Sequence, residues 1–206
     1  PSTLLYGSSA VGGVVNVIDN RIPATPPDRP ASGQIEARYG SAANEHTGII
    51  ALTSGNDKFA VRANALRTKT DNVNIPGFAD PTNPANRGTL TNSAISTTSG
   101  AVGATAFWSS GNAGLAVSEY DSNYGVPVGE PINIDMKQKR VDLRAESSPN
   151  AGPFKLIKTR FGIADYRHAE VDTTTGLANT KFRNKAYEGR LELIQQEAGN
   201  LTGTIG

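Results

Sequence analysis

Three side chains that can bind a metal ion occupy alternate positions in the C-terminal half of the chain: His168, Glu170 and Asp172. In an extended strand, residues two apart point to the same side. One imidazole and two carboxylates that face the same way can hold a divalent cation. Charged residues are also commonplace at exposed strand tips without any metal. The triplet is therefore a candidate metal site at the mouth of a loop, with a plain polar strand tip as the alternative interpretation.

A second set of candidate ligand-binding residues lies in and beside a predicted loop over residues 125–135. The set consists of Tyr120, Tyr124, Glu130 and Asp135. The two tyrosine rings can stack on an aromatic chelator. An aromatic belt at a membrane interface explains the same two rings equally well. Both interpretations stay open from the sequence.

The composition excludes several classes of function. With 20 basic and 19 acidic residues, the formal net charge is +1, whereas proteins that bind nucleic acid usually carry a basic excess. The chain has no cysteine and two histidines, which excludes thiol chemistry, disulfides and histidine-rich metal clusters. No nucleophile elbow or zinc-protease motif is present, and the glycine-rich run 7–13 lacks the lysine of a phosphate loop. We therefore expect neither an enzyme nor a resident cofactor.

Hydrophobic alternation with a period of two dominates the chain, and no window has the apolar stripe of a helix. For example, Val141, Leu143 and Ala145 alternate with charged residues. The pattern predicts an all-β protein. The predicted strands cover residues 33–41, 45–54, 57–69, 93–108, 113–124, 136–146, 154–168, 182–194 and 198–206.

Short and long connections alternate along these strands. Apart from a first hairpin at 41–44, tight turns such as 109–112 alternate with longer links at 71–92, 125–135 and 169–181. In an antiparallel meander, every second connection lies at the same end, so one end has the tight turns and the other the loops. This asymmetry is typical of a transmembrane β-barrel. A soluble β-sandwich shows the same alternation within its strands and stays open as an alternative.

Aromatic residues gather near both ends of the predicted strands. Phe59, Phe107, Trp108 and Phe154 lie beside tight turns, and Tyr120, Tyr124, Tyr166 and Phe182 lie toward the loops. Two such bands favour rings at the two membrane interfaces. Charges of both signs on the alternate positions suit a barrel interior filled by a polar plug. Because Tyr166 breaks the parity of its segment, we expect a bulge near Asp165, or the strand leaving the membrane there.

The first thirty residues differ from the meander. The apolar segment from Leu4 to Asp19 is punctuated by Gly7, Gly12 and Gly13, which permit unusual backbone angles or close approach. The four prolines of residues 22–30 then deny a strand ladder its N–H groups and predict an extended linker. The chain has no initiating methionine and stops within a predicted strand, so we expect it to be a piece of a longer protein.

Residues 1–19 resemble the end of the plug domain of TonB-dependent outer-membrane receptors. Pro1, Leu-Tyr-Gly-Ser at 5–8, Gly-Gly at 12–13 and Val-Val-Asn-Val-Ile at 14–18 stand at the matching places. The residues of this structural plug motif are Tyr6, Gly7, Gly12, Gly13 and Asn16. Segments 122–127 and 182–193 are similar to barrel segments of the same family, above all in its receptors for metals and metal complexes.

The resemblance implies a plug inside a barrel of about 22 strands in the bacterial outer membrane. Residues 1–20 would be the end of the plug, 21–32 the plug–barrel linker, and 33–206 about nine strands of an antiparallel meander that forms part of a large transmembrane β-barrel. The implied function is TonB-dependent active uptake of a siderophore-like metal chelate or of a metal ion. Zinc receptors of this branch often have a histidine-rich loop where residues 125–135 have none, which counts against zinc.

The resemblance also implies the partners. These are TonB, through a segment upstream of the plug and outside this chain, a metal-chelate ligand and outer-membrane lipid, with no nucleic acid. A passive outer-membrane channel or adhesin barrel is an alternative, although passive pores have no plug-like segment. A soluble β-sandwich binding module is the third interpretation.

Overall fold

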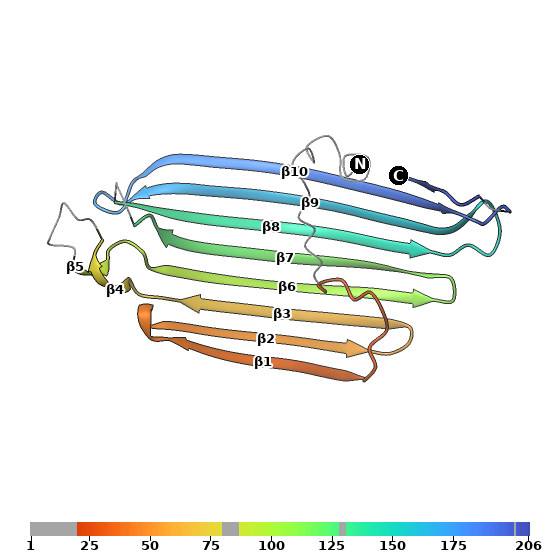
Figure 1. Cartoon of the computed structure of the whole chain (residues 1–206), viewed down its shortest axis with the longest axis horizontal. Helices are drawn as coiled ribbons and strands as arrows, with labels where there is room; N and C mark the ends of the chain where they lie inside the picture. The colour runs from red at the N-terminus through yellow and green to blue at the C-terminus, as the bar shows by residue number, and fades with distance from the viewer. Residues whose placement is uncertain (1–19, 80–86, 128–130, 200) are drawn as a thin grey trace.

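A computed structural model describes residues 20–79, 87–127, 131–199 and 201–206. These residues are mostly strand, with one 3₁₀ helix, so the predicted all-β fold is confirmed. The plug motif residues Tyr6, Gly7, Gly12, Gly13 and Asn16, as well as Glu130, lie outside the described ranges. The elements in Figure 1 are β1 (Ala31–Gly40), η1 (Ser41–Ala43), β2 (Glu45–Gly55), β3 (Phe59–Lys69), β4 (Val73–Phe78), β5 (Arg87–Leu90), β6 (Ile95–Trp108), β7 (Gly111–Gly125), β8 (Ile132–Ser147), β9 (Phe154–Asp172), β10 (Ala178–Gln195) and β11 (Thr204–Ile205).

One antiparallel sheet contains nine of the strands, in the order β1-β2-β3-β6-β7-β8-β9-β10-β11. The other two, β4 and β5, pair with each other within the connection from β3 to β6. The large sheet is therefore a meander, and Figure 1 shows its strands side by side in a single layer. A sandwich requires two stacked sheets, so the described residues do not have that architecture. In the described part of the chain, no helix has the length and apolar character needed to cross a membrane.

The two ends of the sheet have different connections. At one end, only Ser109 and Ser110 separate β6 from β7. At the same end, Asn56 closes the β2–β3 turn, because its side-chain oxygen accepts hydrogen bonds from the N–H groups of Lys58 and Phe59. The β4–β5 hairpin lies in a connection at the opposite end, which we call the loop end. Only the β3–β6 connection, residues 70–94, follows the predicted division: the other loop-end connections, 126–131 and 173–177, are no longer than 148–153 at the turn end.

The predicted loop over residues 169–181 is wrong, because most of it is strand. β9 continues to Asp172 and β10 begins at Ala178, which leaves residues 173–177 as the turn. The alternation in this stretch is short: Ala169 and Val171 alternate with Glu170 and Asp172, and residues 178–181 are mostly polar, so the strands were not predicted to extend into it. Similarly, β8 begins at Ile132, within the loop predicted over 125–135.

The bulge expected near Asp165 is also wrong. Asp165 pairs with Lys139 on β8 and with Lys185 on β10 in continuous register. The irregularities of the β9–β10 pair lie at the ends of β10, between Ala178 and Thr180 and between Ile194 and Gln195. Tyr166 therefore faces the side opposite to Asp165 through ordinary alternation.

The register gives the sheet two chemically different faces. The residues that lie directly opposite one another on neighbouring strands form cross-strand rows, and each row belongs to one face. Successive rows alternate between the two faces. The apolar face is the side of the sheet that carries Leu52, Val61, Val102, Leu115, Val117, Val141, Leu143, Phe161, Ile163, Tyr187 and Leu191, together with every second row from these along the strands. The polar face is the opposite side, which carries Arg62, Asn64, Thr105, Ser118, Arg140, Asp142, Arg144, Arg160, Glu188 and Arg190 and the rows that alternate with those of the apolar face.

The large apolar side chains are the exposed ones. Leu52, Val102 and Leu191 retain 51%, 52% and 51% of their accessible surface. No large side chain of the described residues is fully buried. Within the strands, the buried residues other than glycine are small: Ala60, Ala101, Ala116, Ala164, Thr47, Thr97, Thr105 and Ser122. All of these small residues belong to polar-face rows. The described residues thus lack the buried apolar layer with which a water-soluble sheet offsets its folding entropy.

The linker before β1 lies against the polar face. The Thr105 hydroxyl donates to the Pro23 carbonyl oxygen at 2.7 Å, and the Arg21 guanidinium donates to the Ser118 hydroxyl oxygen at 2.8 Å. Farther along, the backbone N–H of Gly55 donates to the Pro30 carbonyl oxygen. The close approach requires glycine at position 103, where a Cβ atom would collide with the Arg21 carbonyl oxygen.

Replacing Gly103 with valine is expected to displace the linker while leaving the sheet intact. Since the chain has no cysteine, Ile22→Cys supplies a single thiol that reports linker exposure. We expect G103V to raise the rate of maleimide labelling at that thiol about tenfold, equivalent to losing one or two hydrogen bonds of about 1 kcal/mol each. Gly48→Ala is the control, since nothing lies within 4 Å of a Cβ there. Equal labelling rates in all three backgrounds would contradict the linker position.

Candidate functional site

His168 lies in an aromatic cluster on the polar face, toward the loop end. Its Nδ1 atom is 2.9 Å from the Tyr166 hydroxyl oxygen. The imidazole stacks on Phe182, its cross-strand partner on β10, with ring centroids 4.4 Å apart. Tyr166 also meets the imidazole edge to face at 5.6 Å. These contacts fix the ring plane and engage Nδ1 with a hydroxyl group, the kind of outer contact that orients a metal-binding histidine through Nε2.

Met136 of β8 lies directly opposite His168, on the strand that flanks β9 on the side away from β10. The two residues pair across β8 and β9, and side chains in such positions have Cβ atoms about 4.5–5.5 Å apart on the same face. Met136 is the only methionine of the chain. A thioether and an imidazole together favour a soft or borderline transition metal over calcium or magnesium. Sequence analysis missed Met136, because its neighbour is thirty-two positions away and only the strand register joins them.

The triplet of alternate residues shares one strand, as the sequence suggested. His168, Glu170 and Asp172 all lie in β9, within polar-face rows. The Asp172 carboxylate already accepts hydrogen bonds from the backbone N–H groups of Thr174 at 2.7 Å and Thr175 at 2.9 Å. Within the described ranges, no three histidine, aspartate or glutamate side chains converge closely enough to hold a metal ion. The metal-binding role of the triplet stays a prediction.

The second candidate set is divided between the two faces. Tyr120 and Tyr124 belong to polar-face rows of β7, and the Tyr120 row also contains Gln138 and Tyr166. Asp135 pairs with residues of the opposite face, so the structure does not bring it together with the tyrosines. A ligand-binding role for these residues stays a prediction.

The aromatic residues near the loop end do not form a belt on the apolar face. Their rows place Tyr120, Tyr124, Tyr166 and Phe182 on the polar face. The predicted aromatic belt was based on how near each ring lies to a strand end, and it did not take into account which face of the sheet the ring occupies. Near the tight turns, by contrast, Phe59 and Trp108 do lie on the apolar face and are half exposed.

Ion pairs cross the polar face between the His168 cluster and the tight-turn end of the sheet. Arg140 contacts Asp142 at 2.7 Å on its own strand and Glu188 of β10 at 3.3 Å. Arg21 of the linker lies 4.0 Å from Asp142, so the linker joins this network. Arg190 and Glu192 form a further pair on β10. Charges that are this closely matched leave the face polar but nearly neutral locally, which suits a surface covered by another polar segment.

Comparison with known proteins supports the fold and leaves the site chemistry open. No protein-family model matches the sequence. Among solved structures, the chain is similar to the copper transporter OprC, with a TM-score of 0.61 and 11% sequence identity. The likeness covers 81% of this chain and 25% of that chain, so this chain spans about a quarter of the transporter's length. The chain shares its fold with part of a transporter. At this identity the likeness concerns the fold alone.

The turn after β9 is expected to loosen in acid. Hydrogen bonds from the backbone N–H groups of Thr175 and Thr174 hold the pKa of the Asp172 carboxyl below its ordinary value of 3.8. A lowered pKa means that the ionised group stabilises the turn above the ordinary value, and that this contribution disappears as the pH falls through the lowered pKa. Hydrogen exchange at Thr174 and Thr175, corrected for intrinsic pH dependence, should therefore accelerate below about pH 4.

Asp172→Asn is the matched control for this effect. Its amide oxygen still accepts hydrogen bonds but does not titrate. Protection of the two amides should consequently be independent of pH in this range in D172N. A similar loss of protection in D172N on acidification would show that another group governs the turn.

Proposed function

We propose that this chain is part of an outer-membrane receptor that takes up a metal ion or metal chelate by TonB-dependent active transport. In this proposal the apolar face meets membrane lipid and the polar face lines the barrel interior. TonB acts through a segment outside this chain, and the imported metal is cargo. The proposed divisions are residues 1–20 for the end of the plug, 21–32 for the linker and 33–206 for barrel strands.

The exposure of large aliphatic side chains, where a water-soluble protein would bury them, supports the proposal most strongly. Nearer the tight turns, leucine, valine and isoleucine side chains cover one exposed face, while charged residues and the linker occupy the other. A barrel in lipid needs this arrangement, because hydrocarbon surrounds the outside and the interior is polar. The likeness to part of a copper transporter points the same way.

The linker supports a plugged receptor over a passive channel. Arg21 and Pro23 bind residues of β6 and β7 on the polar face, well away from β1, into which the linker leads. A chain segment that crosses the interior-facing side obstructs an open pore. A passive channel has no need of such a segment, whereas a receptor must connect its plug to its barrel.

Copper is the cargo that the His168 cluster fits best. Thioether sulfur selects Cu(I), and imidazole binds copper in either oxidation state. Met136 and His168 supply these two ligands from facing positions, and Tyr166 orients the imidazole through Nδ1. The copper transporter of similar fold supports the same cargo. Glu170, Asp172, Tyr120 and Tyr124, on the same face, are proposed to contact a hydrated or chelated ion as it passes.

Membrane insertion tests the proposed orientation of the faces. Val141→Arg and Leu191→Arg should each destabilise the assembled barrel by about 2–4 kcal/mol if the site is near the bilayer midplane. Thr98→Arg is the control, because Thr98 shares a row with Arg67 and Asp121 on the same face. The readout is heat-modifiable migration of the membrane-extracted protein. Normal assembly of both V141R and L191R would contradict the proposal.

Copper binding tests the proposed cargo site. Met136→Leu and His168→Gln should each weaken Cu(I) binding at least tenfold, measured by competition with a chromogenic Cu(I) chelator. Tyr166→Phe should weaken it about tenfold or more, because outer contacts of this kind typically contribute 10–100-fold. His46→Gln is the control, since the ring of His46 packs against Tyr39 on the other face. Equal affinity in M136L and wild type would exclude this cluster as the copper site.

A further inference from the structure

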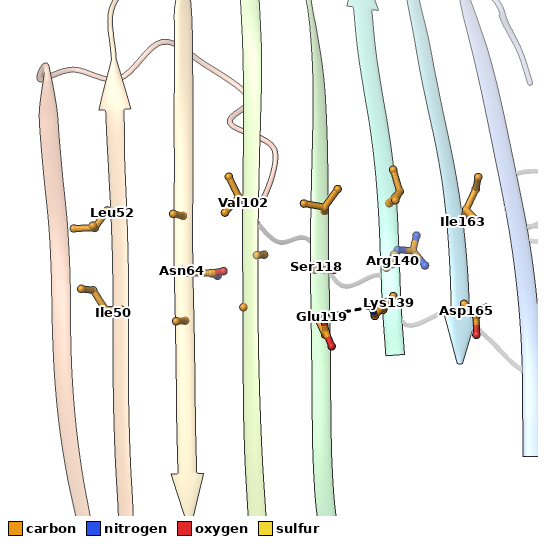
Figure 2. Close-up of a pocket in the computed structure, with 16 residues that line it drawn as sticks. Ile50, Leu52, Asn64, Val102, Ser118, Glu119, Lys139, Arg140, Ile163 and Asp165 are labelled. Carbon is orange, nitrogen blue, oxygen red and sulfur yellow. Dashed lines mark ion pairs between the residues drawn. The ribbon is translucent and has the colours of Figure 1, made fainter. Parts of the chain in front are cut away.

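A shallow groove of about 700 Å³ lies on the apolar face. Two neighbouring rows of that face supply most of its lining, and the row between them supplies Asn64, Ala101, Ser118 and Arg140. Figure 2 shows residues from both rows across neighbouring strands. One row is aliphatic throughout: Leu52, Ala63, Val102, Val117, Val141 and Ile163. The next row changes character along its length: Ile50, Ala65, Gly100, Glu119, Lys139 and Asp165. The groove is therefore apolar over β2, β3 and β6 and bordered by charges over β7, β8 and β9.

The hollow of the groove results from small side chains. Ala63, Ala65 and Gly100 lie between the larger Ile50 and Leu52 on one side and Val117 on the other. Small residues on a surface exposed to lipid leave room for an alkyl chain to lie close to the backbone. The groove thus has the width and chemistry to hold a hydrocarbon tail.

Beyond the charged side of the groove, three cations face one another in a single row. Lys137 pairs with Arg167, and Arg167 pairs with Arg183, on three consecutive strands. Like charges directly opposite one another destabilise a sheet. Lys137 contacts Glu119 and also Asp121 at 3.2 Å.

The outer cations of this row form close ion pairs, whereas the middle one interacts only at longer range with Glu119 and Asp165, which already pair with Lys137 and Arg183. Arg183 contacts Asp165 at 2.9 Å. The exposed Arg167 between them forms no ion pair within 4 Å with any described residue. Lys139 and Lys185 add two more positive charges in the adjacent row. Five bases (Lys137, Lys139, Arg167, Arg183 and Lys185) thus share three acids (Glu119, Asp121 and Asp165), which leaves a local excess of positive charge that favours an anion.

We propose that this surface binds one anionic membrane lipid, with its phosphate on the Lys137–Arg167–Arg183 row and an acyl chain in the groove. The inference rests on the proposed membrane location. The arrangement fits a lipid because the cations border an apolar groove on the same face. A free phosphate would use the cations alone and has no need of the groove. The guanidinium of Arg167 offers paired N–H donors that match phosphate oxygens.

Lipid retention by the purified, detergent-solubilised protein tests this site. Native mass spectrometry would compare dioleoyl phosphatidylglycerol, dioleoyl phosphatidylcholine and inorganic phosphate. We expect one phosphatidylglycerol to be retained with at least tenfold higher affinity than phosphatidylcholine, and no competition from millimolar inorganic phosphate. Equal retention of the two lipids would overturn the proposal. Displacement of phosphatidylglycerol by inorganic phosphate would assign the cations to a soluble anion instead.

Matched variants separate the headgroup contact from the groove. Arg167→Gln should reduce phosphatidylglycerol affinity about tenfold, and Arg167→Lys should restore part of it. Arg67→Gln is the control, because Arg67 lies at the far end of the same row, three strands from Lys137, where it faces Thr98 and Gly48 rather than cations. An equal loss in R67Q would reduce the effect to net charge and overturn the assignment of the phosphate to Lys137, Arg167 and Arg183.

Filling the groove tests the acyl chain. A Cβ at Gly100 would make only ordinary contact with the Asn64 carbonyl oxygen, so Gly100→Leu should fold and occupy the hollow. It should weaken retention of both lipids several-fold, and unchanged retention would exclude the groove. If the protein stays monodisperse without detergent, the proposed membrane function fails. A heat-modifiable barrel that does not discriminate between the lipids contradicts only the lipid site.

Discussion

A single-layer sheet has no interior of its own, and this constraint governs the whole molecule. The backbone N–H and C=O groups are satisfied between strands, so the ladder holds its shape without a core. Each face must then find its stabilising contacts outside the sheet. The apolar face offers Leu52, Val102 and Leu191 to its surroundings, and the polar face is covered in part by the linker through Arg21 and Pro23. The fold, the proposed cargo site and the proposed lipid surface all follow from that division.

The same alternation places the functional groups. Tyr166 and His168 lie on the polar face, while Asp165 and Arg167, one position away from them, lie on the apolar face. One strand therefore contributes both to the proposed copper cluster and to the proposed phosphate row. Neither cluster is local in sequence, because each requires β8, β9 and β10 to pair in one particular register.

Sequence alternation was sufficient to predict the all-β meander and most strand positions, because large apolar residues recur at every second position in segments such as 141–145. It failed where the alternation is short and lacks large apolar residues, as at the end of β9 and the start of β10, since such segments resemble loops. It also assigned the parity break at Tyr166 to a bulge, although the ladder is regular there. The pairing of Met136 with His168 lay beyond sequence reasoning, since a one-residue slip would send the two side chains to opposite faces.

One row of the apolar face bears on geometry at a larger scale. It begins with Ile35 and Ile50 and ends with Lys139, Asp165 and Lys185. All points at one depth of a bilayer have the same polarity. In the proposed membrane, a row that changes from aliphatic to charged along its length therefore cannot run parallel to the membrane plane. The strands, perpendicular to the row, must lean. A sheet of tilted strands closes into a barrel only if its first and last strands are shifted relative to each other. For a given number of strands, that shift determines the radius of the barrel. In the proposed barrel, the side chains of this one row thus help to determine the barrel radius.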